Sequence, residues 1–307
     1  MARLRILHLS DSHLLGDGAL HYGSVDTTAA LDALLAAAAG IARLDVVVAS
    51  GDLSDDGSPA SYRLLRDRLE PWAAARGARV VYAMGNHDDR AGFAAMLGDG
   101  HGGESATGPI GGVSEIAGYR VVTLDSTVPG AGYGHLDAGQ LARLRAVLAA
   151  PSPHGTVVVL HHPPVPAVTP LLRALELQNP GDLACAVAGS DVRLILPGHY
   201  HHLLVDRLGG VPVVVAPGIA NTTDTCAPEG TERAHVGAAA LVVELGGAAG
   251  LRLHSVAARM DGDGREVFSL DATEVARIAA IAGPGAEAPG FEPGMGINPN
   301  RISSAAP

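Results

Sequence analysis

Five short clusters of aspartate, asparagine and histidine stand out in this sequence, because each follows directly after an apolar run. They read SDSH at residues 10–13, SGD at 50–52, GNHD at 85–88, HHP at 161–163 and GHYH at 198–201. Each cluster alone is typical of an ordinary turn. Five in order, all at the ends of apolar runs, indicate side chains that meet at one place, because ligands of open α/β sheets bind at the carboxyl ends of the strands.

The side chains in these clusters are those that bind transition-metal ions. Asp, Asn and His without Cys favour Mn, Fe, Zn or Co, and we expect Mn or Fe first. Asp11 and His13 are two residues apart, so both can face one ion from an extended turn. His199 and His201 share that spacing on a loop that starts with glycine, which can turn them towards different ions. Asp52 can bridge two sites through its two oxygens, which gives two ions about 3.5–4 Å apart, as in two-metal hydrolysis.

The apolar runs that must position these clusters are short and rich in β-branched residues, as strands are. We expect strands over residues 4–9, 46–50, 80–84, 120–124, 156–160, 193–196, 211–216, 239–245 and 251–257, and helices over 26–39, 59–75, 89–97 and 137–149. This alternation predicts an α/β core with parallel pairing. The last three strands have no helices between them and should pair antiparallel at one side. We therefore expect two packed sheets flanked by helices.

The chain is expected to contain one catalytic domain, residues 1–258, followed by a C-terminal extension, residues 259–307. Within the extension, the pattern over residues 273–282 predicts a short helix. The Gly- and Pro-rich stretch 283–307 predicts a flexible tail.

The composition limits the partners. A formal net charge of −11, with no lysine, disfavours duplex nucleic acid and acidic membranes, although metal ions can reverse the sign locally for a phosphate. Cys185 and Cys226 are the only cysteines, so we expect no disulfide framework and two small buried side chains. No apolar signal segment and no unbroken membrane-spanning stretch occur, which favours a soluble cytoplasmic protein without integral membrane association.

The five clusters resemble the pattern of the calcineurin-like metallophosphoesterases, which is Asp-x-His, Gly-Asp, Gly-Asn-His-Asp/Glu, His and Gly-His-x-His. All five blocks are present in order, from Asp11 to His201. The segments GNHDDR at 85–90 and LHHPP at 160–164, with the loop 125–141, make the sequence most similar to class III cyclic-nucleotide phosphodiesterases, with bacterial glycerophosphodiesterases next. The resemblance implies a four-layer α/β-β/α sandwich, in agreement with the strand pattern.

The resemblance also implies how the metal ligands divide between two ions. One ion should be held by Asp11, His13, Asp52 and His201. The other should be held by Asp52, Asn86, His161 and His199. Four protein ligands for each ion leave room for a bridging hydroxide and for substrate oxygens.

A catalytic role is implied for His87, which follows a ligand directly. It should protonate the leaving oxygen or neutralise transition-state charge. Asp55, which we prefer to Asp88, should orient its ring. A phosphate over both ions must contact the inner faces of the side chains around it, which we expect to be His13, Asp52, Asn86, His87 and His201.

Other histidines next to or near the clusters have plainer interpretations. His162 follows His161 in a strand, so it should point away from the metals. It should then either pack in the interior or support a metal ligand from behind. His21 lies on a loop that could rim the pocket, although exposure to solvent is the expected state.

The expected function is hydrolysis of 3′,5′-cyclic nucleotides such as cAMP to 5′-monophosphates, by attack of a metal-bridging hydroxide. A glycerophosphodiesterase or a 2′,3′-cyclic-nucleotide phosphodiesterase with the same metals is the nearest alternative. A non-catalytic, metal-dependent binding or scaffold protein is an alternative of another class, against which the intact His87 argues. The resemblance also implies a homodimer, although no residue demands one.

Overall fold

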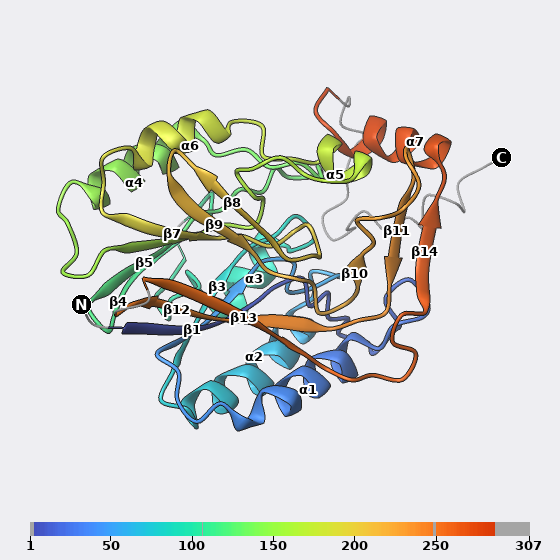
Figure 1. Ribbon diagram of the computed structural model, residues 1–307, viewed down its shortest axis with the longest axis horizontal. Helices are drawn as coiled ribbons and strands as arrows, with labels where there is room; N and C mark the ends of the chain where they lie inside the picture. Colours follow the sequence, from blue (N-terminus) through green and yellow to red (C-terminus); the bar gives the residue numbers. More distant parts are fainter. Residues whose placement is uncertain (1–2, 106, 248–249, 286–307) are drawn as a thin grey trace.

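The computed structural model describes residues 3–105, 107–247 and 250–285. Two large sheets form its centre (Figure 1). The first has the strand order β13-β12-β1-β2-β3, with bounds Leu251–Ala257, Ala239–Gly246, Arg3–Leu9, Val46–Ser50 and Arg79–Ala83. The second has the order β4-β5-β6-β7-β9-β8, with bounds Val113–Ile116, Tyr119–Thr123, Thr156–Val159, Val192–Leu196, Val211–Val215 and Leu204–Leu208.

The two sheets pack face to face because their central strands are apolar on both faces. In β1, Leu4 and Ile6 enter the layer between the sheets, whereas Leu7 and Leu9 point towards the helices on the other side. Such near-continuous apolar runs are what parallel strands covered on both faces require. The pairs β1–β2, β2–β3, β5–β6, β6–β7 and β7–β9 are all parallel.

Helices cover the outer face of each sheet (Figure 1). The first sheet is covered by α1 (Thr27–Ala37), α2 (Pro59–Ala74) and α3 (Arg90–Leu97), with the short 3₁₀ turn η1 (Ala38–Gly40) after α1. The second is covered by α4 (Ala138–Leu148), α5 (Pro170–Ala174) and α6 (Pro180–Val187). The sequence of layers is therefore helix, sheet, sheet, helix, and the expected four-layer α/β sandwich is confirmed.

The pairing of the last three expected strands was predicted wrongly in part. The strands β12 and β13 do pair antiparallel and extend the first sheet beside β1. However, β9 belongs to the second sheet, parallel to β7. The cause is β8, a strand with a charged, exposed centre that the apolar pattern missed; it forms a hairpin with β9 across Gly209 and Gly210, both at positive φ.

A third, small sheet joins the C-terminal extension to the body. It has the order β10-β11-β14, with bounds Thr222–Thr223, Glu232–His235 and Glu266–Leu270. The predicted helix is confirmed as α7 (Ala272–Ala282), which packs on α5 through Leu171, Leu175 and Ile278. The boundary at residue 258 stays a prediction, and the predicted flexible tail lies, after Gly285, outside the described residues.

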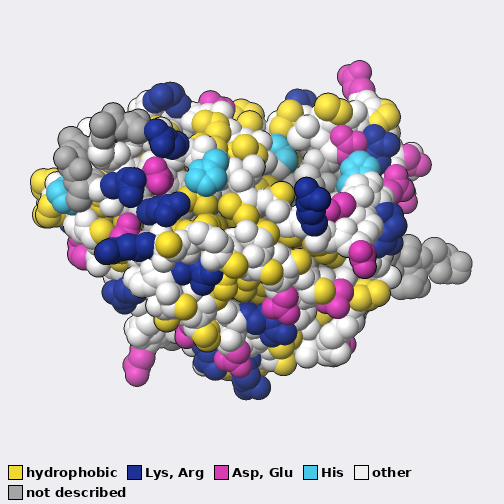
Figure 2. Space-filling view, turned by 60° about the horizontal axis from the view of Figure 1, so that its bottom comes forward, with side chains coloured by type: hydrophobic (Ala, Val, Ile, Leu, Met, Phe, Trp, Pro, Cys, Tyr) yellow, Lys and Arg dark blue, Asp and Glu magenta, His cyan; other side chains and the backbone are white. Residues whose placement is uncertain are grey.

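The surface shows how the charge of the chain is distributed. On the face in Figure 2, arginine side chains gather in the left half, whereas acidic side chains are spread over the face. Cys185 and Cys226 are both exposed, so the prediction that they are buried was wrong. Cys185 lies on the outer side of the amphipathic helix α6, where a small residue needs no burial. Among the described residues, no helix is long and apolar enough to cross a membrane.

Candidate metal centre

All five clusters lie in loops at the carboxyl ends of parallel strands, namely β1, β2 and β3 of the first sheet and β6 and β7 of the second. The loops after β1 and β2 are tied together, since the Asp11 and His13 N–H groups donate to the carbonyls of Gly51 and Asp52 at 3.0 and 2.9 Å. Close packing requires glycine at two points. A Cβ at Gly85 would overlap the Asp52 nitrogen, and one at Gly51 would overlap the His161 ring.

The backbone of these loops is strained where the predicted ligands stand. Seven non-glycine residues in the described part of the chain have a positive φ. Five of them are predicted ligands, namely Asp11, His13, Asp52, His199 and His201, with φ between 42° and 69°. Such conformations cost free energy and persist where the surrounding structure enforces them, typically at functional sites.

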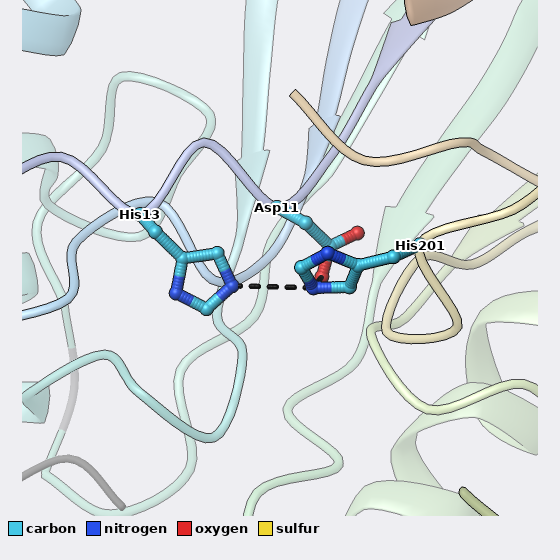
Figure 3. Close-up of side chains that lie close together, drawn as sticks. All are labelled: Asp11, His13 and His201. Carbon is cyan, nitrogen blue, oxygen red and sulfur yellow. Dashed lines mark hydrogen bonds and ion pairs between the residues drawn. The ribbon is translucent and has the colours of Figure 1, made fainter. Parts of the chain in front are cut away.

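The first group of side chains comes from the loops after β1 and β7. Figure 3 shows the rings of His13 and His201 facing one another beside the Asp11 carboxylate. Their Nε2 atoms are 3.3 Å apart, and His201 Nε2 lies 3.3 Å from Asp11 Oδ1. These three residues can offer ligand atoms that lie within 4.8 Å of one another. This group contains three of the four residues expected at the first ion.

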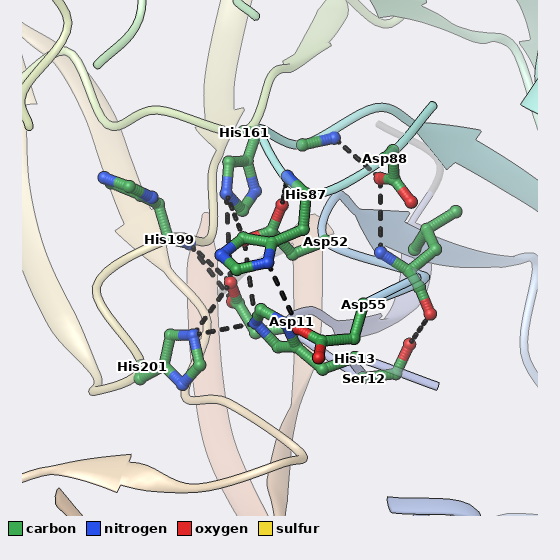
Figure 4. A network of polar contacts seen from close by, with 12 residues as sticks. Asp11, Ser12, His13, Asp52, Asp55, His87, Asp88, His161, His199 and His201 are labelled. Atoms are coloured by element: carbon green, nitrogen blue, oxygen red, sulfur yellow. Dashed lines mark hydrogen bonds and ion pairs between the residues drawn. The ribbon is translucent and has the colours of Figure 1, made fainter. Parts of the chain in front are cut away.

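The second group joins the loops after β2, β3, β6 and β7 (Figure 4). Asp52, His161 and His199 can offer ligand atoms within the same mutual distance. Asn86, the fourth expected ligand, lines the same pocket as Asp52 and His199, and its Oδ1 is buried without a hydrogen-bond partner. The structure therefore brings together all seven predicted ligands.

One oxygen of Asp52 stands between the two groups. Asp52 Oδ2 lies 3.6 Å from His13 Nε2 and 3.3 Å from His161 Nε2. Asp52 Oδ1 instead accepts the His87 N–H at 2.8 Å. The sequence suggested that Asp52 bridges two ions through both of its oxygens. In the structure only Oδ2 faces both groups, because Oδ1 is occupied by the backbone N–H of His87 in the loop after β3.

The histidines predicted as ligands are oriented through the ring nitrogen that does not face the site. The partners of these nitrogens are Asp55 Oδ1 for His13 Nδ1 at 3.1 Å, Ser50 O for His161 Nδ1 at 2.9 Å, Leu175 O for His199 Nε2 at 3.1 Å and Asn221 Oδ1 for His201 Nδ1 at 2.9 Å. Metal-binding histidines characteristically donate their second N–H to such acceptors. His161 Nε2 is buried and has no hydrogen-bond partner, as expected of an atom placed to bind an ion.

The buried charge of the site also fits metal ions. Asp11 and Asp52 are almost fully buried. Burial alone would raise the pKa of both carboxyl groups, but His201 lowers that of Asp11 to about 2, and His161 holds that of Asp52 well below its usual range. Both are therefore anionic at neutral pH. No arginine is among the described residues that line the pocket, so imidazoles are the groups there that can offset the two buried carboxylates, and metal ions bound by these imidazoles would take over that role.

His87 points into the same network from the loop after β3 (Figure 4). Its Nδ1 lies 3.1 Å from Asp55 Oδ1. Burial alone would lower the pKa of His87, but Asp52 and Asp55 raise it to about 9. Asp88 serves another purpose, because its carboxylate accepts backbone N–H groups of Gly85, Leu53 and Ser54 at 2.8 to 3.2 Å. Of the two carboxylates considered for orienting His87, Asp55 is the one beside its ring.

A pocket opens over both groups. The five residues expected to contact the phosphate, His13, Asp52, Asn86, His87 and His201, all line it. Asp11 and His161 lie behind them and are fully buried. Contact of these five with a substrate stays a prediction.

Sequence reasoning missed His21, which was expected to be exposed and is buried. Its Nδ1 lies 3.4 Å from Asp55 Oδ2, and its Nε2 lies 3.5 Å from the amide nitrogen of Asn221, the residue that contacts His201. These contacts hold the loop inward over the site, and within the loop His21 and Val25 form a β-bridge. No local pattern signals this burial. His162, by contrast, is held by Ser126 and the Gly132 carbonyl, as expected of a packing residue.

Comparison with known proteins places this geometry in a family. A family model described as calcineurin-like phosphoesterase matches residues 4–203. Over 235 residues, the chain is 43% identical to a protein of Rhodococcus erythropolis named "Probable cyclic nucleotide phosphodiesterase", with 76% of each chain covered. It is 41% identical over 235 residues to a cAMP/cGMP dual specificity phosphodiesterase of Mycobacterium tuberculosis, covering 76% of this chain and 73% of that one.

Among solved structures, the fold resembles a dimetal phosphatase from Danio rerio. The TM-score is 0.56 at 17% identity, and the match covers 83% of this chain and 99% of that chain, which supports the shared fold. The family match over most of the sandwich, together with the two sequence identities, shows that the chain belongs to the calcineurin-like phosphoesterases.

Proposed function

We propose that this chain is a dinuclear-metal phosphodiesterase that hydrolyses 3′,5′-cyclic nucleotides to 5′-monophosphates. The observation that carries the proposal is the position of Asp52 Oδ2, within 3.6 Å of imidazoles from both ligand groups, in a pocket that His87 also lines. The names of the two relatives support the substrate class.

The protein groups would hold two divalent ions in this arrangement. When bound, the ions supply Lewis acidity for the phosphoryl oxygens and a source of hydroxide at neutral pH. Asp11, His13 and His201 would hold one ion, and Asn86, His161 and His199 the other, with Asp52 shared between them. The backbone constraints described above keep these side chains fixed before substrate arrives, so little reorganisation accompanies binding.

His87 would act on the substrate itself. With Nδ1 facing Asp55, the ring presents Nε2 to the pocket, where it can donate a proton to the departing ribose oxygen as the P–O bond breaks. Asp55 keeps the ring in this orientation. A purely structural metal site would not need an imidazole at this position, which argues against the alternative of a binding or scaffold protein.

A substrate panel tests this proposal. The Mn²⁺-loaded protein would be assayed with 3′,5′-cAMP, 2′,3′-cAMP and glycerophosphocholine at equal concentrations. The proposal expects the highest kcat/KM with 3′,5′-cAMP. Turnover of glycerophosphocholine or of 2′,3′-cAMP well above that of 3′,5′-cAMP would reject the substrate and would favour the corresponding alternative with the same metals.

The same proposal includes three finer points. Mn or Fe are proposed as the native ions before Zn or Co, within a ligand set of carboxylate, amide and imidazole groups without thiolate that suits all four. The protein is proposed to act in the cytoplasm, and to do so as a homodimer. Elemental analysis, fractionation of cells and light scattering would test these points in turn.

A further inference from the structure

The pocket over the metal centre has a second wall that is almost entirely apolar. It is lined by Leu171 of α5, by Leu175 directly after α5, by Phe268 of β14 and by Ile278 of α7. Phe268 is half-buried and lies edge-on to Tyr22, with ring centroids 5.1 Å apart. The side chains of this wall also pack α7 on α5. A phosphate makes no use of apolar surface, so the part of this wall that faces the pocket is available to another part of the ligand.

One acidic side chain interrupts this apolar wall. Glu232 of β11 lines the pocket, is only 2% exposed and is fixed because its Oε2 accepts the Leu171 N–H at 3.3 Å. No arginine lines the pocket with it among the described residues. A buried carboxylate without a cation is costly, and such a group is commonly placed to accept a hydrogen bond from a bound partner.

We propose that this wall is the subsite for the purine base of the cyclic nucleotide, with Glu232 accepting a hydrogen bond from the exocyclic amino group. The inference rests on the proposed function, which supplies the phosphate end of the same ligand. A purine offers apolar faces for the leucines and Phe268, and an amino group that donates to a carboxylate. A glycerol-type alcohol has no apolar face to match this wall.

The subsite would be built by the C-terminal extension together with the body of the protein. Phe268 and Ile278 lie beyond residue 258, whereas Leu171 and Glu232 lie before it. The packing of α7 on α5 therefore has a role in substrate choice as well as in folding.

The experiment compares cAMP with the cyclic monophosphate of purine riboside, which differs only in lacking the amino group. Burial raises the pKa of Glu232 to about 7, so assays at about pH 8.5 keep it as an acceptor. Wild-type kcat/KM should favour cAMP by about ten- to hundredfold, the range for a hydrogen bond to a charged group. In Glu232→Ala, the ratio of kcat/KM for cAMP to that for the analogue should fall close to one. Glu232→Gln keeps an acceptor oxygen and should retain part of the preference for cAMP.

Two controls separate binding of the base from the integrity of the fold. Hydrolysis of bis(p-nitrophenyl) phosphate, which has no base, should stay within about twofold in both Glu232 variants. Phe268→Ala, at a half-buried position, should raise KM for cAMP and for its analogue alike, without changing their ratio.

The outcomes distinguish this inference from the proposed function. The subsite is wrong and the function stands if the wild type hydrolyses cAMP but its preference for cAMP over the analogue is the same in Glu232→Ala. The same conclusion follows if Phe268→Ala leaves KM for both substrates unchanged. If the wild type hydrolyses bis(p-nitrophenyl) phosphate but neither cyclic nucleotide, the proposed function fails and the subsite with it.

Discussion

Replacing Asp55 by asparagine tests how the site is held in place. The Asp55 carboxylate is nearly buried and faces three imidazoles, with distances of 3.1 Å to His13 Nδ1, 3.1 Å to His87 Nδ1 and 3.4 Å to His21 Nδ1. Asparagine has the same shape but no charge, and its single amide oxygen cannot accept from all three rings. The substitution should therefore loosen the rings of the proposed ligand His13 and of the proposed catalytic residue His87 together.

The size of the effect follows from these contacts. A hydrogen bond to a charged group contributes about 1.5–3 kcal/mol, and loss of a partner behind a metal ligand typically costs about 10–100-fold in metal affinity or activity. We expect Asp55→Asn to weaken the affinity for one ion about 10–100-fold through His13. At saturating Mn²⁺, kcat should remain at least about tenfold below wild type, because excess metal does not reorient His87.

The assay measures metal affinity by titration and kcat with bis(p-nitrophenyl) phosphate at saturating metal. Asp56→Asn is the matched control. This neighbouring carboxylate accepts the Gly16 and Ser58 N–H groups at 2.7 and 2.9 Å and contacts no histidine, so the variant should behave like wild type in both measurements. Unchanged metal affinity and unchanged kcat in Asp55→Asn would refute the reasoning.

Three further predictions concern His87, the metals and Glu232. His87→Ala should lower kcat by about 10²- to 10⁴-fold with metal content unchanged, as measured by steady-state kinetics and elemental analysis; wild-type activity would remove its proposed role. Chelation should lower Tm by several degrees and Mn²⁺ should restore it, because the buried carboxylates repel one another without cations; an unchanged melting curve would count against the centre. Glu232→Gln should raise the free energy of unfolding at pH 8 by up to about 3 kcal/mol and change it little at pH 4, because the fold raises the pKa of Glu232 from 4.5 to about 7. The stability that the neutral carboxyl group contributes is complete below pH 4.5 and is lost as the pH rises through 7. Urea unfolding that shows the same difference in free energy between wild type and Glu232→Gln at both pH values would contradict this.

Much of the fold could be predicted because its central strands are continuous apolar runs. The strands β2 and β13 begin and end at the residues predicted from the sequence, and α2 begins at Pro59 as predicted. The elements that could not be predicted are those without a clear pattern of apolar residues. The centre of β8 is charged and exposed, and β11 and β14 form a small sheet at one edge that shares no core with the large ones.

The candidate site could be predicted as a set of residues but not as a geometry. Strand ends supplied the seven metal-ligand candidates, because parallel strands place their carboxyl ends at one edge. The sequence could not show that Asp52 Oδ1 is occupied by the His87 N–H, since that depends on how two loops approach. It also could not show that His21 is buried, because the loop that carries it is held by tertiary contacts with Asp55 and Asn221.

Anomalous diffraction from crystals of the Mn²⁺-loaded protein would show directly whether the two groups of side chains hold two ions. Two ions bound as proposed would give two peaks on either side of Asp52 Oδ2, about 3.5–4 Å apart. One peak should lie among Asp11, His13 and His201, and the other beside His161 and His199. No peak, or a single peak outside these two groups, would contradict the proposal.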